Sequence, residues 1–167
     1  AGVGERIDIP TTRLMMALKI NALGQGFSGI SQTTLKQLIA LYNAEIYPLI
    51  PSQGSVGASG DLAPLAHMSL PLLGEGAVIY QGQEMPAKEA LNQAGLQCID
   101  LQPKDGLALL NGTQASLAFA LRGWYLAKHF WRAAIISGAM TVDAGQASDQ
   151  PFDLRIHQVR RQKGQQY

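Results

Sequence analysis

The sequence is poor in cysteine and in charged residues. Cys98 is the single cysteine among 167 residues, which excludes an internal disulfide framework and a zinc site built from four cysteines. Charged residues make up 15% of the chain and hydrophobic residues 47%, whereas an average soluble domain carries roughly 25% charged residues. This balance excludes a disordered chain. It indicates that much of the surface is buried, either by folding or by partner subunits.

A strong net charge and a long apolar run are also missing. The 13 basic and 12 acidic residues leave a net charge of +1, so there is no global basic field to attract nucleic acid. No stretch approaches the ~18 apolar residues that a membrane span needs, because Ser137 and Gly138 interrupt the most apolar region, 133–140. We expect neither a nucleic-acid partner nor a membrane. The single cysteine fits a reducing compartment, and we predict a cytoplasmic location.

Several isolated features favour structural roles over chemistry. Three scattered histidines and one cysteine do not form a metal site, and His67, on an apolar helix, is interpreted as a core residue. Trp124 and Trp131 are predicted to lie in a core or in an interface between long helices. A short basic cluster near the end lacks interleaved aromatic residues, so we interpret it as a solvated helix face or a subunit contact. It consists of Arg155, Arg160, Arg161 and Lys163.

Apolar residues recur at three- and four-residue spacing along most of the chain, which is typical of helices. The pattern predicts helices over 11–23, 31–46, 61–73, 86–94, 104–110, 113–142 and 152–163. Ser31 is a good N-cap for the second helix, and Pro48 ends it. A short hairpin is expected over 77–85. We therefore predict an all-α fold with long buried helices, organised as a single helical unit over residues 1–167.

The segment 48–60 is rich in glycine, proline and serine, and it leads into a helix that starts at Asp61. Leucines surround that helix on nearly all sides, which predicts burial all round. Three glycines before a helix could cradle a phosphate. The phosphate-loop pattern, however, requires a Lys and a Ser or Thr after the last glycine, and here Asp61 and Leu62 follow. Spacing alone favours a plain glycine-rich turn capped by Asp61.

A second chemistry fits the tripeptide Ala58-Ser59-Gly60 better. The amide nitrogen of Gly60 can attack the carbonyl carbon of Ala58, which closes a five-membered ring with loss of water. Loss of the Ser59 hydroxyl as a second water leaves an exocyclic methylene. The product is 4-methylideneimidazole-5-one, a strong electrophile. Gly60 has no side chain to block the close approach, and helix N-termini aimed at the ring would stabilise negative charge on it.

These residues carry a family resemblance. The stretch 54–67, GSVGASGDLAPLAH, resembles the prosthetic-group signature of the aromatic amino-acid ammonia-lyases. The stretch 106–114, GLALLNGTQ, resembles their second signature. The segments 19–29, 43–51 and 151–165 are also similar, so the resemblance covers essentially the whole chain in the family's order.

The resemblance implies the helical core of the ammonia-lyase (L-aspartase-like) fold and an electrophile made from Ala58, Ser59 and Gly60, with no external cofactor. It implies that Asn111 lies beside the ring and holds the substrate amine and the ring oxygen, and that Asp61 caps its helix and helps to position the ring. Gln114 and the tail 152–157 resemble the histidine branch of the family. This branch eliminates ammonia from the small-molecule substrate L-histidine to give trans-urocanate, in a homotetramer.

By the same resemblance, the chain is an internal fragment. The family's catalytic base is a tyrosine on a loop N-terminal to Ala1, and its carboxylate-binding arginine and a second tyrosine lie C-terminal to Tyr167. We therefore expect this chain to supply the electrophile and one wall of the site without turning over substrate alone. Two other interpretations stay open. One is a phenylalanine or tyrosine ammonia-lyase or an aminomutase, and the other is a non-catalytic helical association module or an inactive fragment.

Overall fold

The structure is a computed structural model that describes residues 2–160 and 164. Arg161 and Lys163 of the predicted basic cluster lie outside these residues. The chain divides into two compact units, 1–122 and 123–167, and each unit is described by itself below.

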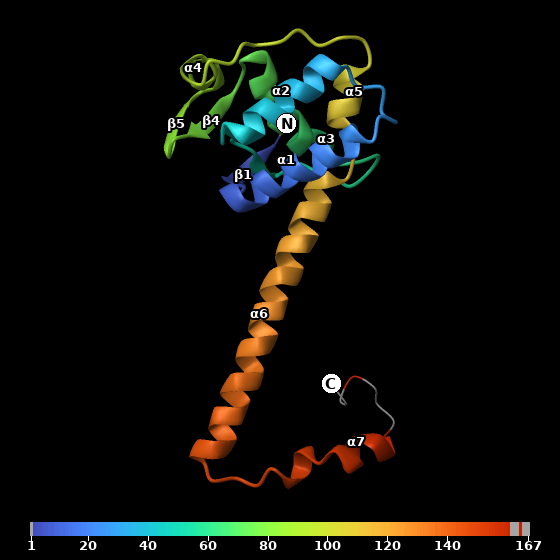
Figure 1. Cartoon of the computed structure of the whole chain (residues 1–167), viewed down its shortest axis with the longest axis vertical. Helices are drawn as coiled ribbons and strands as arrows, with labels where there is room; N and C mark the ends of the chain where they lie inside the picture. Colours follow the sequence, from blue (N-terminus) through green and yellow to red (C-terminus); the bar gives the residue numbers. More distant parts are fainter. Residues whose placement is uncertain (1, 161–163, 165–167) are drawn as a thin grey trace. The chain divides into compact units, whose positions relative to one another are not determined.

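Helices dominate both units, as predicted (Figure 1). The first unit holds β1 (Val3–Arg6), α1 (Ile9–Gly24), α2 (Gln32–Asn43), β2 (Tyr47–Pro48), β3 (Pro51–Gln53), α3 (Leu62–Ser69), the 3-10 helix η1 (Leu70–Leu73), β4 (Ala77–Tyr80), β5 (Gln83–Pro86), α4 (Ala87–Gln93) and α5 (Asp105–Leu110). Helix α6 (Gln114–Ala144) begins in the first unit and continues into the second. The second unit also holds the 3-10 helix η2 (Gln150–Phe152) and α7 (Leu154–Arg160).

The first two helices begin at side-chain caps. The Asp8 carboxylate accepts a hydrogen bond from the Thr11 amide at 2.8 Å at the start of α1. The Ser31 hydroxyl accepts one from the Thr34 amide at 3.2 Å at the start of α2, so the predicted cap is confirmed. Helix α2 ends at Asn43, before the predicted end near residue 46. Glu45 adopts a left-handed φ of 57°, which cannot continue a right-handed helix.

Two small antiparallel sheets accompany the helices. The predicted hairpin is confirmed, since β4 pairs with β5 around a turn at Gln81 and Gly82, both with positive φ. Strand β2 extends this sheet on the other side of β4. Strands β1 and β3 form the second sheet. The segment 48–60, predicted to be irregular, thus contains β3, because its pairing partner lies far away in the sequence and leaves no local signal.

The core of the first unit is built from the inner faces of its helices and sheets. Its fully buried members include Met15, Met16, Leu38, Leu41, Ile46, Ile50, Leu65, Met68, Leu72, Val78 and Leu91. The predicted burial of the whole surface around α3 is wrong. Leu65 and Met68 are buried, but Leu62 is 44% exposed and Leu73 of η1 is 38% exposed. One face of this helix therefore remains open in the chain.

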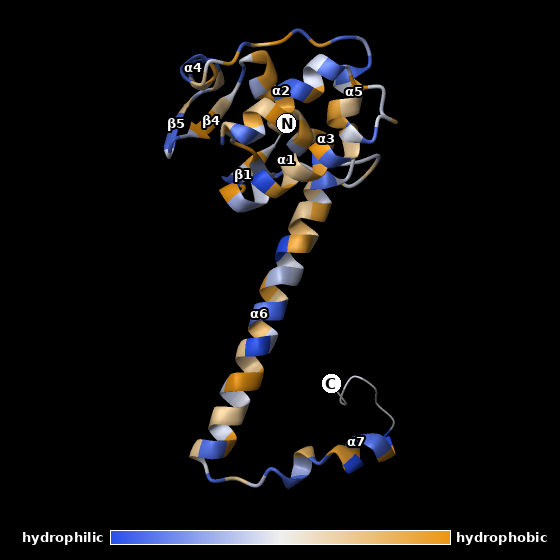
Figure 2. Cartoon of the chain, viewed as in Figure 1, coloured by the Kyte–Doolittle hydropathy of each residue, from blue (hydrophilic) through white to orange (hydrophobic). Residues whose placement is uncertain are grey.

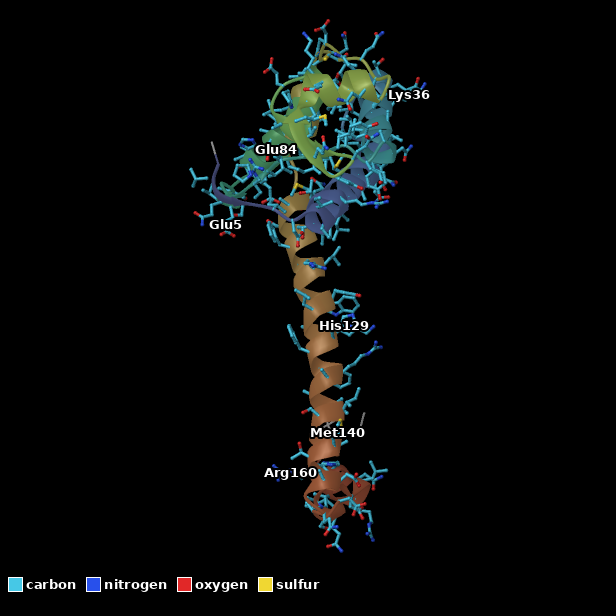
Figure 3. All side chains as sticks on the ribbon, turned by 90° about the vertical axis from the view of Figure 1, so that its left-hand side faces the viewer. Glu5, Lys36, Glu84, His129, Met140 and Arg160 are labelled. Carbon is cyan, nitrogen blue, oxygen red and sulfur yellow. The ribbon has the colours of Figure 1, made fainter. Side chains whose placement is uncertain are left out.

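Helix α6 is exposed along most of its length. Among its described residues, only Ala115 and Ala118 are buried. Figure 2 shows apolar residues distributed along the helix, and Figure 3 shows side chains such as His129 and Met140 projecting outward from it. Trp124 and Trp131 are both more than half exposed, so their assignment to a core of this chain is wrong. The alternative, a helix interface, stays a prediction. None of the described helices is both long enough and apolar enough to cross a membrane.

Candidate functional site

The glycine-rich loop before α3 takes an unusual backbone path at the predicted tripeptide. Ser59 has a φ of 62° and Gly60 a φ of 108°. A left-handed conformation costs a serine roughly 1–2 kcal/mol. Ala58 and Ser59 are exposed, whereas Gly60 is partly buried. The loop therefore presents the alanine and the serine outward, on a turn that is anchored at its glycine.

Gly60 packs directly against the turn that joins α5 to α6. A methyl group added to its Cα would lie 2.8 Å from the Gly112 carbonyl oxygen and 3.0 Å from the Gly112 nitrogen. Both contacts involve backbone, which cannot move aside cheaply, and the positive φ adds strain for any larger residue. A hydrogen bond of 2.7 Å from the Asp61 amide to the Gly112 carbonyl closes the contact. Glycine at position 60 is therefore a packing requirement.

The Asp61 carboxylate joins the loop to the start of α6. It is 1% exposed and accepts hydrogen bonds of 2.7 Å from the Ser116 amide, the Ser116 hydroxyl and the Ser55 hydroxyl. The prediction that Asp61 caps its own helix is wrong, because its side chain makes no capping bond to α3. It lies at the N-terminus of the 31-residue helix α6 instead, where the free amides and the helix dipole stabilise negative charge.

Burial and hydrogen bonding act in opposite directions on this carboxylate. Burial raises the pKa of Asp61. Hydrogen bonds from Ser116, Ser55 and the Ala115 amide lower it, and the net result is a pKa below its ordinary value of 3.8. Asp61 is therefore an ionised anchor at neutral pH, and it is not poised to accept a proton there.

Asn111 lies beside the loop, at the end of α5. Its backbone N–H donates to the Leu107 carbonyl oxygen at 3.0 Å. Its side-chain oxygen, Oδ1, would lie 3.2 Å from a methyl group on Gly60. Three of the residues singled out in the sequence, Gly60, Asp61 and Asn111, thus meet at one place, although about fifty positions separate the loop from the asparagine. This meeting brings an amide side chain next to the predicted electrophile.

Gln114, at the start of α6, packs against the same turn. Its Oε1 atom is buried, and within the described residues it has no hydrogen-bond partner. Gln114 and Asn111 line a cavity of about 330 Å³, together with residues of α1, α5 and the loop that follows α1. The lining consists of Lys19, Ala22, Leu23, Phe27, Ser28, Lys104, Leu107, Ala108, Asn111 and Gln114. The Oε1 atom lies against Gly112 of this turn, so Gln114 joins the turn to the wall of the cavity.

Lys19 is a buried cation at this site that the motif analysis did not single out. It is 1% exposed, and its Nζ donates to the Asn111 carbonyl oxygen at 3.0 Å. Burial lowers its pKa to about 8. The signal was present in the sequence, because Lys19 lies four residues after Met15 and four before Leu23. The buried face of α1 runs through Met15, Lys19 and Leu23.

Comparison with known proteins identifies the family. Over residues 1–167 the sequence matches the family described as aromatic amino acid lyase. The chain belongs to this family. Curated histidine ammonia-lyases from Enterobacter sp. (strain 638) and Photorhabdus laumondii are each 61% identical to it over 165 residues. These matches cover 99% of this chain and 33% and 32% of those proteins, so the chain spans about a third of their length.

Solved structures agree with the family assignment. Histidine ammonia-lyase from Trypanosoma cruzi matches with a TM-score of 0.93 and 38% identity, over 99% of this chain and 33% of that one. Phenylalanine aminomutase from Pantoea agglomerans matches with a TM-score of 0.89 and 33% identity, over 95% of this chain and 30% of that one. The resemblance inferred from the sequence signatures is therefore confirmed for the lyase family and for its helical fold.

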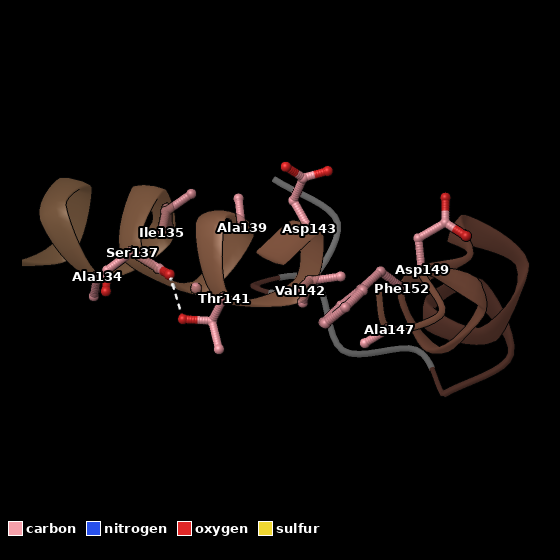
Figure 4. A pocket seen from close by; sticks show the side chains of 11 residues that line it. Ala134, Ile135, Ser137, Ala139, Thr141, Val142, Asp143, Ala147, Asp149 and Phe152 are labelled. Atoms are coloured by element: carbon pink, nitrogen blue, oxygen red, sulfur yellow. Dashed lines mark hydrogen bonds between the residues drawn. The ribbon is translucent and has the colours of Figure 1, made fainter. Parts of the chain in front are cut away.

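The rest of the described lyase chain offers weaker candidates. The second unit holds a cavity of about 1120 Å³ between the end of α6 and η2, lined mostly by small and apolar side chains (Figure 4). The Thr141 hydroxyl at this cavity is already bound to the Ser137 carbonyl at 2.8 Å. No group of three potential metal ligands occurs within the described residues. The convergence of polar residues on the glycine-rich loop therefore marks the candidate site.

Proposed function

We propose that this chain is part of a histidine ammonia-lyase, an enzyme that eliminates ammonia from L-histidine to give trans-urocanate. The observation that carries the proposal is the 61% identity to curated histidine ammonia-lyases over 165 residues. Membership in the aromatic amino acid lyase family supports the reaction class, a carbon–nitrogen lyase. The substrate follows from the names of those relatives.

The residues present fit the prosthetic group that the family resemblance implies. The left-handed backbone at Ser59 and Gly60 folds the tripeptide sharply, and Gly60 fills a space in which a methyl group would meet Gly112. Ala58, Ser59 and Gly60 would form 4-methylideneimidazole-5-one with loss of two water molecules. Once formed, the group supplies an electrophilic alkene carbon to the substrate, and no external cofactor is needed.

The surrounding residues take distinct roles in this proposal. Asp61 holds the loop on the start of α6 through its bonds to Ser55 and Ser116. The Asn111 amide, next to Gly60, binds the substrate amine and the ring oxygen. Gln114 lines the same cavity and helps to orient the substrate. The base and the carboxylate-binding residues come from parts of the enzyme outside these 167 residues.

We also propose that the enzyme is a cytoplasmic homotetramer. Exposed aromatic residues along α6 support a subunit interface, because Trp124, Phe130 and Trp131 are each more than 60% exposed. Large apolar side chains that gather on an exposed surface typically mark contact sites. The family resemblance supports four subunits and a cytoplasmic location.

The test uses a hybrid enzyme, defined as the Enterobacter histidine ammonia-lyase in which these residues replace the matching 165. It is incubated with L-histidine, L-phenylalanine and L-tyrosine, and the conjugated products are followed by their ultraviolet absorbance. We expect urocanate from L-histidine and no cinnamate or coumarate. The Ser59→Ala hybrid, which keeps the backbone and lacks the leaving hydroxyl, is expected to lose activity by at least about 10³-fold, since covalent catalysis is removed.

Intact mass spectrometry with peptide mapping supplies a readout that does not depend on substrate. The active hybrid should be lighter than its sequence by two water molecules, located at residues 58–60, and the Ser59→Ala hybrid should not. Cinnamate from L-phenylalanine in place of urocanate would contradict the substrate proposal. A folded hybrid without the mass loss and without activity would support a non-catalytic association module.

A further inference from the structure

The turn between α5 and α6, residues 111–113, is held from both sides by opposite charges. The ammonium of Lys19 binds the Asn111 carbonyl at the end of α5. The Asp61 carboxylate binds the Ser116 amide at the start of α6. Carbonyls at a helix end attract cations and amides at a helix start attract anions, so each residue complements the helix terminus that it contacts.

Lys19 is unusual because its charged group is buried with few interactions that offset the loss of hydration. It is 1% exposed, and within the described residues no ion pair involves it and its one hydrogen-bond acceptor is the Asn111 carbonyl. A buried ammonium is costly unless it is paired and hydrogen-bonded. The buried neighbours of Lys19 on α1 are Met15, Met16 and Leu23. An apolar residue at position 19 would match these surroundings. Core packing alone therefore does not explain a lysine here.

The hydrogen bond of Lys19 is one residue away from the contact with the loop that carries Ala58, Ser59 and Gly60. Asn111 accepts the bond, and the carbonyl of the next residue, Gly112, accepts the Asp61 amide at 2.7 Å and faces Gly60. A shift at Asn111 therefore moves both its own side chain and the surface on which Gly60 rests. Displacements of about 1 Å at a reacting group can cost ~10²-fold in rate.

We propose that Lys19 is a positioning residue of the lyase site: its ammonium fixes the Asn111–Gly112 peptide so that the Asn111 amide and the Gly112 carbonyl are held against Gly60. Lys19 acts through Asn111 and does not itself touch the reacting atoms. This assignment rests on the proposed lyase function. It adds a residue of α1 to a site otherwise built from the loop and the turn.

The test compares the Lys19→Met and Lys19→Arg hybrids with the Lys36→Met hybrid. Methionine replaces the apolar stem of lysine with an unbranched chain one atom shorter and cannot donate, whereas arginine keeps the donor. Lys36 is exposed on α2 (Figure 3), and its Nζ donates to Gln32 Oε1. Its loss therefore controls for a change of net charge. Each hybrid is assayed for kcat and KM with L-histidine, for the fraction of chains that have lost two waters, and for its melting temperature.

For Lys19→Met we expect kcat to fall by about 10- to 100-fold, with KM changed by less than about threefold, and a lower fraction of cyclised chains. Lys19→Arg should restore at least half of the cyclised chains that Lys19→Met loses. Lys36→Met should match the unsubstituted hybrid in kcat, KM and cyclised fraction. A lower melting temperature with unchanged kcat and cyclisation would overturn the proposal in favour of a purely structural lysine. A rise in KM alone would also overturn it, because Lys19 would then bind substrate directly.

These outcomes are separable from a failure of the proposed function. If the unsubstituted hybrid makes no urocanate, the histidine assignment fails, while the cyclised fraction still reports on Lys19. If the hybrid makes urocanate and Lys19→Met retains full kcat and full cyclisation, only the positioning role fails.

Discussion

Two buried carboxylates anchor two different regions of the first unit, and each does so by accepting hydrogen bonds from residues at the start of a helix. Asp105 is fully buried and accepts hydrogen bonds from the Ser31 amide at 2.6 Å, the Ser31 hydroxyl at 2.8 Å and the Thr34 hydroxyl at 2.7 Å, at the start of α2. Asp61 does the same at the start of α6 with Ser116. Each carboxylate belongs to a distant segment. Asp61 caps α6 through the Ser116 amide, whereas Asp105 holds Ser31, the residue that caps α2.

The two regions differ in their remaining donor. Asp105 takes its further bond from the Gln102 amide, three residues away in its own connection. Asp61 takes its further bond from the Ser55 hydroxyl, on the loop that carries Ala58, Ser59 and Gly60. Asp105 therefore ties one helix to a connecting segment. Asp61 ties a helix to the loop on which the proposed chemistry depends, so we expect this stabilising contact to have a functional consequence only there.

Removing each carboxylate gives the strongest test of this comparison. In the 167-residue chain, Asp61→Ala and Asp105→Ala should each lower the free energy of unfolding by about 3 kcal/mol, because several buried donors lose a charged acceptor. Urea titrations followed by circular dichroism measure this loss. In the hybrid enzyme, only Asp61→Ala should reduce the fraction of chains that have lost two waters. An equal reduction with Asp105→Ala would mean that general destabilisation, and not the link to the loop, controls cyclisation.

Lys19, a buried cation, extends the comparison of the buried carboxylates to alkaline pH. Burial lowers its pKa from 10.5 to about 8, so between these values the unfolded chain binds more protons than the folded chain. Stability from this group therefore rises with pH across that window. Between pH 8 and pH 10, the unsubstituted chain should gain about 2 kcal/mol relative to Lys19→Met.

Urea titrations of both chains at several pH values check the Lys19 prediction. Lys36→Met is the control, because Lys36 is exposed and should give no such difference from the unsubstituted chain. A constant difference between the Lys19→Met and unsubstituted chains from pH 8 to pH 10 would show that the buried lysine keeps an ordinary pKa.

The helices and the hairpin could be predicted from the sequence because their signals are local. Ser31 caps α2 through a residue three positions away, and the hairpin turns at Gln81 and Gly82. The tripeptide could also be found, because Ala58, Ser59 and Gly60 are consecutive and their chemistry depends on residue type. The signals that located the loop therefore lie within a few residues of one another.

The partners of the loop could not be predicted in this way. Asp61 meets Ser116 across 55 positions, and Lys19 meets Asn111 across 92. Local reasoning assigned Asp61 to the nearest helix terminus, which is a reasonable prior for an acidic residue before a helix. Tertiary packing offered a second terminus, α6, with a hydroxyl as well as free amides. The choice between two helix termini depends on the folded arrangement, which periodicity does not encode.

The smallest effect is expected from the donor that distinguishes the two regions. Ser55→Ala removes one of the hydrogen bonds to Asp61 and leaves both bonds from Ser116, so the chain should lose only about 1 kcal/mol of stability at pH 7. Thr34→Val, which removes one hydroxyl from Asp105, is the matched control and should cost a similar amount. Urea titrations at pH 7 and at lower pH values compare the two variants.

Acid should remove both differences. The pKa values of Asp61 and Asp105 both lie below 3.8 in the folded chain, so stability from these carboxylates is fully present above that value and is lost as pH falls through the folded pKa. The deficits of Ser55→Ala and Thr34→Val should therefore shrink together below pH 3.8. In the hybrid enzyme the two variants should separate, since only Ser55→Ala loosens the loop and slows the loss of two waters. Equal cyclisation rates would show that the Ser116 bonds alone suffice to hold Asp61 and the loop in place.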